Sequence, residues 1–188
     1  MYKGPNRKNM RLREYNYSEN GHYFVTICTK DKISFFGEIK DGEMLLNEFG
    51  KIAKNLWMES DLHFKNCKVD EFIIMPNHLH GIIIIEDYLT GNIDLHKQKV
   101  GNADLHKQKV GNADLRSLQR TKMYLSKIIH GFKSSFTRKI NKEIENNNFS
   151  WQNSFYERII RNEEELGKIR EYIVNNPLKW EFDEDNIY

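Results

Sequence analysis

The chain has 188 residues, of which 30% are charged and 39% hydrophobic, and its formal net charge is +2. This length suits a single domain, and the composition with only two cysteines excludes collagen, low-complexity polymers and disulfide-built scaffolds. No run approaches the roughly 18 apolar residues that a membrane span needs, and residues 1–17 lack the apolar core of a secretory signal. We therefore expect one cytoplasmic domain over 1–188 that does not contact a membrane.

In the first half, runs rich in β-branched and aromatic residues surround one helical stripe of apolar residues. The predicted strands are 22–29, 69–75 and 79–86, and a hairpin is predicted over 33–46. The dipeptide Asp41-Gly42 is the expected turn of that hairpin. Asn47 is the expected N-cap of the helix that follows it.

The second half begins with a ten-residue direct repeat, GNIDLHKQKV and its copies, over residues 91–116. The repeat has too few apolar positions to build a core, so we expect it to form a surface loop. An apolar stripe over 118–140 then predicts a long helix, and residues 154–160 predict a strand. Asn162 is the expected N-cap of a last helix that ends near Asn175.

The order strand, helix, strand, strand, helix, strand, helix is the split β-α-β arrangement of ferredoxin-like folds. We therefore predict an α+β fold with an antiparallel sheet and helices on one face. A hairpin is inserted after the first strand, and one helix is added at the C-terminal end.

Positive charge is concentrated in two segments without acidic residues, 1–13 and 116–142, whereas the chain from Glu157 onward is acidic. Such segregation indicates either an anionic partner or solvated helix faces. The bases that we expect to contact an anionic partner such as a nucleic acid are Arg11 and Arg13 in a basic N-terminal arm (1–20), and Arg116, Arg120, Lys127, Lys133 and Arg138 on the long helix.

His78 and His80 open the second strand of the central pair, where alternate residues share a face. Two neutral imidazoles side by side form half of a metal site. Two packed histidines without a metal are the alternative, although polar side chains before the apolar run GIIII need a partner. Cys67 could complete a zinc site with them, so a zinc-dependent hydrolase is one hypothesis from a different class.

Tyr172 lies beside the apolar stripe of the last helix, and a side-chain amide three or four positions later shares its face. Asn175 and Asn176 both meet that condition. A packing tyrosine followed by an Asn-Pro helix stop is the structural alternative. Tyr124, Tyr156 and Tyr188 are rivals for the reactive phenol, and spacing alone does not exclude Tyr156.

The segments MPNHLH (75–80), GFKSSFTRKIN (131–141), WQNSFYERIIRNEEEL (151–166) and YIVNNP (172–177) together carry a resemblance. With them, the chain resembles the single-tyrosine HUH transposases, most closely the REP-associated tyrosine transposases of the IS200-like superfamily. This resemblance implies an enzyme that cleaves and rejoins single-stranded DNA through a 5′-phosphotyrosine on Tyr172. It also implies that His78 and His80 hold Mg²⁺ or Mn²⁺, with Asn176, Asn175 or water as a third ligand.

The same resemblance implies a substrate of palindromic repeats folded into hairpins with a flanking single strand. The protein would act as a monomer or homodimer and would associate with the nucleoid when bound to DNA. A non-catalytic hairpin-DNA-binding protein of the same fold is the nearest alternative. Trp151, Phe155 and Tyr156 are expected to stack on unpaired bases, with core packing as the alternative for Trp151 and Phe155.

Overall fold

The computed structural model describes residues 21–86, 113–144, 147–183 and 186, and in the long helix it describes side chains from Tyr124 on. The strands of the main sheet, in spatial order, are β4 (Cys67–Ile74), β5 (His78–Ile85), β1 (Gly21–Cys28) and β6 (Tyr156–Ile160). The remaining elements are a hairpin of β2 (Gly37–Lys40) and β3 (Glu43–Leu46), the helices α1 (Glu48–Met58), α2 (Ser60–His63), α3 (Ala113–Glu143) and α4 (Glu163–Val174), and the 3₁₀ turns η1 (Lys30–Lys32) and η3 (Pro177–Phe182).

All three strand pairs of the main sheet are antiparallel. Because β1 and β4 both run antiparallel to β5, they are parallel to each other and separated by it, which is the split β-α-β unit. The predicted α+β ferredoxin-like fold is therefore confirmed, and the predicted ends of the four strands of the main sheet differ from the observed ones by at most two residues.

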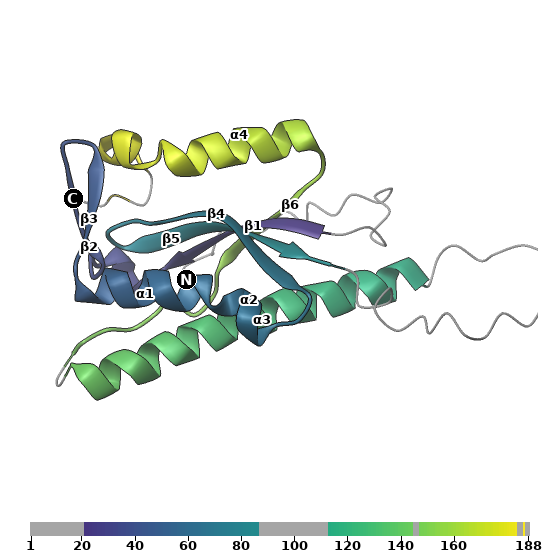
Figure 1. Cartoon of the computed structure of the whole chain (residues 1–188), viewed down its shortest axis with the longest axis horizontal. Helices are drawn as coiled ribbons and strands as arrows, with labels where there is room; N and C mark the ends of the chain where they lie inside the picture. The colour runs from purple at the N-terminus through teal and green to yellow at the C-terminus, as the bar shows by residue number, and fades with distance from the viewer. Residues whose placement is uncertain (1–20, 87–112, 145–146, 184–185, 187–188) are drawn as a thin grey trace, which may run out of the picture.

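Side chains alternate between the two faces of the sheet, and each face has its own helical cover (Figure 1). Helices α1 and α3 cover one face, where Val25, Leu79 and Ile83 lie in the main core cluster. Helix α4 covers the opposite face and packs Leu166 and Ile173 against the sheet there. The expectation of helices on one face thus holds for α1 and α3, and the added helix forms a third layer.

The hairpin and the helix caps follow local sequence rules. Asp41 and Gly42 have φ angles of 54° and 77°, as a two-residue turn with two left-handed positions requires. The Asn47 side-chain oxygen accepts a hydrogen bond from the backbone N–H of Gly50. The Asn162 side chain caps α4 in the same way by accepting from the backbone N–H of Glu165.

Two boundaries depart from the sequence expectations. Helix α3 begins at Ala113, so the last four residues assigned to the repeat loop over 91–116 are helical. No glycine or proline interrupts the chain between Ala113 and Gly131, which allows the helix to extend backward. Pro177 does not simply end the chain's helical structure, because it starts η3 as its first residue.

Residues 1–20, and Arg11 and Arg13 with them, lie outside the described residues.

In the part of the chain that the structure describes, no helix is long and apolar enough to cross a membrane.

We expect Gly81→Ala to destabilise the protein, because a Cβ atom there would lie 2.7 Å from Cζ2 of the fully buried Trp57. Overpacking of this kind costs about 1–3 kcal/mol, measurable by urea unfolding. Gly167→Ala is the matched control, since its Cβ would meet no atom within 4 Å on an exposed helix surface. It should gain up to about 1 kcal/mol. Equal stability of the two variants would contradict the packing described for β5 against α1.

Candidate active site

Two adjacent imidazoles lie at the start of β5, beneath α4 and η3. His78 and His80 are almost fully buried, and their ring centroids are 4.3 Å apart. They share the face of β5 with Ile82, which belongs to the cluster under α4. The predicted pair therefore points to the face of the sheet that carries the last helix.

The tautomer of His78 follows from its neighbour in the chain. His78 Nδ1 lies 2.8 Å from Asn77 Oδ1, and an amide oxygen can only accept, so Nδ1 carries the proton. The orientation of the Asn77 amide is fixed because its Nδ2 donates to the backbone oxygen of Lys32 at 3.0 Å. His78 Nε2 therefore keeps its lone pair, and this buried atom has no hydrogen-bond partner among the described residues.

Burial lowers the pKa of His78 to about 3, with a smaller contribution from the charge of Lys32. An unfolded histidine titrates near pH 6.5, so between these pH values only the unfolded state binds the proton. The free energy of unfolding therefore falls as pH drops below about 6.5. The contribution of His78 to this loss is about 2 kcal/mol at pH 5. We expect urea unfolding in EDTA to show this loss and His78→Gln to reduce it. An unchanged slope in that variant would contradict the neutral, buried imidazole.

Tyr172 of α4 reaches the second histidine directly. Its hydroxyl lies 3.2 Å from His80 Nε2, and His80 Nδ1 lies 2.9 Å from the hydroxyl of Thr26 on β1. Phe24 stacks on the His80 ring and meets the Tyr172 ring edge to face. Tyr172 is 41% exposed, so an outside molecule can reach a phenol whose oxygen touches the buried imidazole pair.

The two rival tyrosines that the structure describes lie elsewhere, and the third, Tyr188, lies outside the described residues. Tyr156 is exposed at the edge strand β6, where its ring meets Phe24 at a centroid distance of 6.4 Å. Tyr124 packs its ring against Phe64 beside the main core cluster. The hydrogen bond to His80 distinguishes Tyr172 from Tyr156, which spacing in the sequence could not do.

A carboxylate and an amide complete the cluster. The ligand atoms of His78, His80 and Asp183 all lie within 4.8 Å of one another. Asn176 is buried and its Nδ2 donates to Asp183 Oδ2 at 3.3 Å, while its Oδ1 has no hydrogen-bond partner among the described residues. His78 Nε2 and Asn176 Oδ1 thus each keep a lone pair without a hydrogen-bond partner among the described residues, and both residues belong to the surroundings of the Asp183 carboxylate. This donor set fits a divalent cation.

Asp183 was not predicted from the sequence, where it belongs to an acidic stretch. The six residues of η3, started by Pro177, turn the chain so that Asp183 returns to the histidines. Proline as the first residue of a new helical turn was the available signal. Of the two candidate amides, Asn176 contacts Asp183, whereas Asn175 is the C-cap residue of α4.

Comparison with known proteins relates the sequence of this chain to a family. Residues 118–176, from α3 through α4 to Asn176, match the family model described as "Transposase IS200 like". A protein of Haemophilus influenzae (strain ATCC 51907 / DSM 11121 / KW20 / Rd), described as an uncharacterized protein, is 38% identical over 182 residues, covering 97% of this chain and 93% of its own length. The chain belongs to the IS200-like transposase family.

A solved structure of a REP-associated tyrosine transposase bound to a REP hairpin is also similar to the chain. It aligns with a TM-score of 0.47 and 18% identity, covering 90% of this chain and 73% of that one.

The zinc site that Cys67 could have formed with His78 and His80 does not form in this IS200-like protein. Cys67 pairs with Ile85, at the opposite end of β5 from His78. Seven residues of strand separate these positions, a distance of about 20 Å. Burial, together with the charge of Asp61, raises the pKa of the Cys67 thiol to about 12, so this thiol stays protonated.

If the histidine site holds Mn²⁺, we expect Cys67→Ser to leave the affinity of the protein for this ion within about twofold of that of the unchanged protein. Isothermal titration of the full chain measures this, with thermal melting as a check on folding. A tenfold loss of Mn²⁺ affinity in a folded Cys67→Ser variant would show that Cys67 contributes to metal binding and would contradict this exclusion.

The predicted DNA-contacting bases divide into three groups. Lys127 and Arg138 are exposed on α3, whereas Arg116 and Arg120 lie in the part of α3 whose side chains are outside the described residues. Lys133 is a correction, because it is buried and its Nζ donates to the backbone oxygens of Gln152 and Ser154. Lys133 thus supports the chain before β6 and does not face a phosphate.

The aromatic residues before and at the start of β6 are also divided. Trp151 and Phe155 pack against the main core cluster, and the Trp151 indole donates to the backbone oxygen of Lys133. Tyr156 is 53% exposed. Packing is therefore the observed role of Phe155, and Tyr156 remains available for stacking.

Proposed function

We propose that this IS200-like protein is a metal-dependent DNA strand transferase that cleaves and rejoins single-stranded or hairpin DNA through a 5′-phosphotyrosine. Tyr172 is the nucleophile. Family membership supports a transposase-like protein that processes DNA. The observation that carries the finer proposal is the 3.2 Å contact between the exposed phenol of Tyr172 and His80, one of the two adjacent buried imidazoles.

The residues at the site fit a resident cation, in this proposal Mg²⁺ or Mn²⁺, which His78, His80, Asp183 and Asn176 would hold. When bound, such a cation neutralises charge that develops on phosphoryl oxygens and orients the phosphate. Its place next to Tyr172 matters because a phenol of pKa about 10 is a weak nucleophile at neutral pH.

Tyr172 performs the covalent step in this proposal. Its oxygen attacks the phosphorus of a DNA phosphodiester, the bond from phosphorus to the 3′-oxygen breaks, and that oxygen leaves with a proton as a 3′-hydroxyl. The phosphotyrosine preserves the ester bond, so a second 3′-hydroxyl can attack it and release Tyr172 without ATP. The Phe24 ring helps to fix the phenol for in-line attack by its edge-to-face contact.

In this proposal one chain supplies both halves of the site, which the hydrogen bond between the Tyr172 hydroxyl and His80 supports. The protein would then act as a monomer, or as a homodimer that contains two such sites. The substrate we propose is a palindromic DNA hairpin with a flanking single strand, as the motif resemblance implies. The exposed Lys127 and Arg138 are available for its phosphates.

Mapping the covalent product tests this proposal. The full chain is incubated with Mn²⁺ and 3′-labelled DNA hairpins that carry randomised single-stranded flanks, and is then separated in SDS. We expect a labelled protein band, and after trypsin digestion a nucleotide mass on the peptide over 171–179, at Tyr172. Cleavage without any covalent band would indicate a hydrolase, and hairpin binding without cleavage would indicate a DNA-binding protein. Either result would overturn the proposal.

A further inference from the structure

Helix α4, which carries Tyr172, covers one face of the sheet as a separate layer and is bonded to both edge strands (Figure 1). In the spatial order β4-β5-β1-β6, these edges are β4 and β6. At the β4 edge, Nε and Nη2 of Arg170 donate to Oδ2 of Asp70 at 3.0 and 2.6 Å. At the β6 edge, Nη2 of Arg158 donates to Oε1 of Glu165 at 2.5 Å. Two ion pairs therefore hold α4 to opposite edges of the sheet.

The two ion pairs also lie on opposite flanks of the helix. The side chains that pack α4 on the sheet form one apolar stripe: Leu166, Ile169 and Ile173. Because each residue turns an α-helix by about 100°, Arg170 lies on one flank of this stripe, and Tyr172 lies with Glu165 on the other. A rotation of α4 about its own axis would therefore stretch the ion pairs and move the Tyr172 hydroxyl relative to His80.

The strand that carries Asp70 is irregular at this residue. The register of β4 against β5 shifts between Val69 and Phe72, so that Asp70 and Glu71 oppose one residue of β5. Such a β-bulge changes the direction of side chains and often lies next to active sites. Regular alternation would put Val69 and Phe72 on opposite faces, yet both pack against the main core cluster. The bulge thus keeps these core contacts while Asp70 reaches Arg170 on the α4 side.

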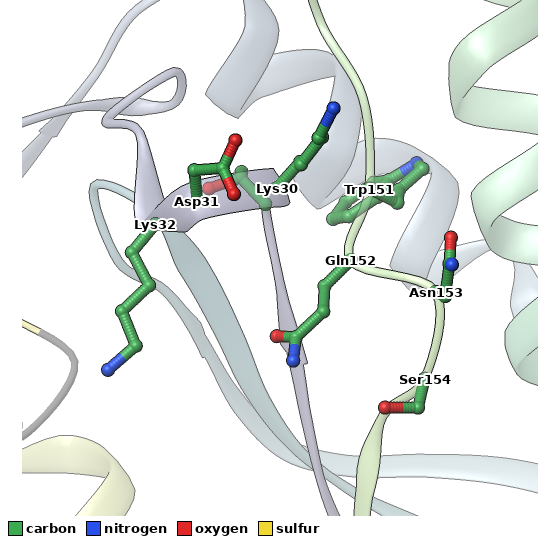
Figure 2. A pocket seen from close by; sticks show the side chains of 8 residues that line it. Lys30, Asp31, Lys32, Trp151, Gln152, Asn153 and Ser154 are labelled. Carbon is green, nitrogen blue, oxygen red and sulfur yellow. The ribbon is translucent and has the colours of Figure 1, made fainter. Parts of the chain in front are cut away.

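The β6 edge is itself fixed where the strand begins. Figure 2 shows the segment before β6, Trp151 to Ser154, beside the turn from Lys30 to Lys32, and a pocket of about 410 Å³ lies between them. The backbone N–H of Gln152 donates to the oxygen of Cys28 at 3.0 Å. Two backbone oxygens of the segment accept hydrogen bonds from the buried ammonium of Lys133. The arginine of β6 that binds α4 therefore projects from a strand with a fixed start.

We propose that the ion pair between Asp70 and Arg170 positions Tyr172 for the covalent step, an inference that rests on the proposed function. The pair between Arg158 and Glu165 opposes it on the other flank of α4. Asp70 and Arg170 are positioning residues, because they act through Tyr172. Partly exposed ion pairs add little to folding stability, whereas in-line attack is sensitive to a displacement of about 1 Å. Loss of the pair therefore lowers the rate of the covalent step much more than it lowers stability.

Single-turnover cleavage of a DNA hairpin with Mn²⁺ measures this effect. We expect Asp70→Asn and Arg170→Gln each to lower the rate about 5- to 30-fold. The double variant should be no slower than either single variant, because each substitution already removes the same pair. DNA affinity should stay within about threefold, and the melting temperature within about 3 °C. Lys168→Gln is the matched control, since its ion pair with Glu164 lies within α4, and it should leave the rate unchanged.

Nuclear Overhauser effects between the rings of Tyr172 and Phe24, whose centroids are 6.0 Å apart, report the position of the phenol without DNA or metal. We expect Asp70→Asn and Arg170→Gln to weaken these cross-peaks and Lys168→Gln to preserve them. Cross-peaks of full intensity in both ion-pair variants, an unchanged cleavage rate, or additive losses of rate in the double variant would overturn the positioning role even if the Tyr172 adduct forms. Weakened cross-peaks in a protein whose unchanged form makes no adduct would refute the proposed reaction and support the ion pair as the contact that holds the Tyr172 ring.

Discussion

Replacing Tyr172 by phenylalanine is expected to abolish the covalent DNA adduct and to lower the rate of strand cleavage by at least about 10³-fold. The substitution removes one oxygen atom, so the edge-to-face contact with Phe24 can remain while the nucleophile is lost. His80 would lose one hydrogen-bond partner and keep the contact with Thr26. Single-turnover cleavage with Mn²⁺ measures the rate, and anisotropy should show DNA affinity unchanged within about threefold.

Tyr156→Phe is the matched control for this prediction. Tyr156 is more exposed than Tyr172 and also meets the Phe24 ring, but its bonds do not include the one to His80 that singles out Tyr172. Its loss of one hydroxyl should leave the cleavage rate within about threefold. The assignment fails if Tyr172→Phe still forms the adduct, or if Tyr156→Phe loses it.

The sequence was sufficient to predict those parts of the site that depend on local periodicity. The pair His78 and His80 was placed on one face by strand alternation, and Tyr172 was placed beside the apolar stripe of the last helix. The order of elements was likewise enough to predict the ferredoxin-like sheet. Joining the two motifs in space required the third layer, in which α4 packs on the β5 face that carries the histidines.

Asp183 and Lys133 show where local patterns end. Asp183 is one acidic residue among several near the C-terminus, and only the path of η3 brings it to the histidines. Lys133 lies on a basic helix. No periodicity could indicate that its ammonium donates hydrogen bonds to two backbone carbonyls that lie 19 and 21 residues later in the chain. Both roles depend on contacts between elements, which spacing along the chain does not contain.

Cys67 illustrates the same limit for a metal hypothesis. The sequence places it before the first histidine by eleven positions, close enough to suggest a shared site. Antiparallel pairing of β4 with β5 then sets Cys67 opposite Ile85, at the far end of the strand. Strand register therefore excludes the zinc site with Cys67, and it leaves the oxygen donors from the C-terminal segment as the partners of the histidines.

Removing a proposed ligand is expected to weaken the binding of Mn²⁺ strongly. We expect His78→Ala and His80→Ala each to lower the affinity by at least about 10²-fold, and Asp183→Asn by about tenfold, because asparagine keeps one oxygen donor and loses the charge. Isothermal titration of the full chain measures these affinities. His130→Ala, at an exposed histidine of α3, is the matched control and should leave the affinity unchanged.

A thermal shift separates lost binding from lost folding. A ligand at 100 times its dissociation constant stabilises the folded protein by about 2.7 kcal/mol, so Mn²⁺ should raise the melting temperature of the unchanged protein. The ligand variants should melt in EDTA as cooperative folded proteins and should lose this increase, while Tyr172→Phe should keep it because the phenol is not one of the proposed ligands. If His78→Ala remains folded and retains the full Mn²⁺ shift, the cation is held elsewhere. The unpaired lone pair of His78 Nε2 would then need another explanation.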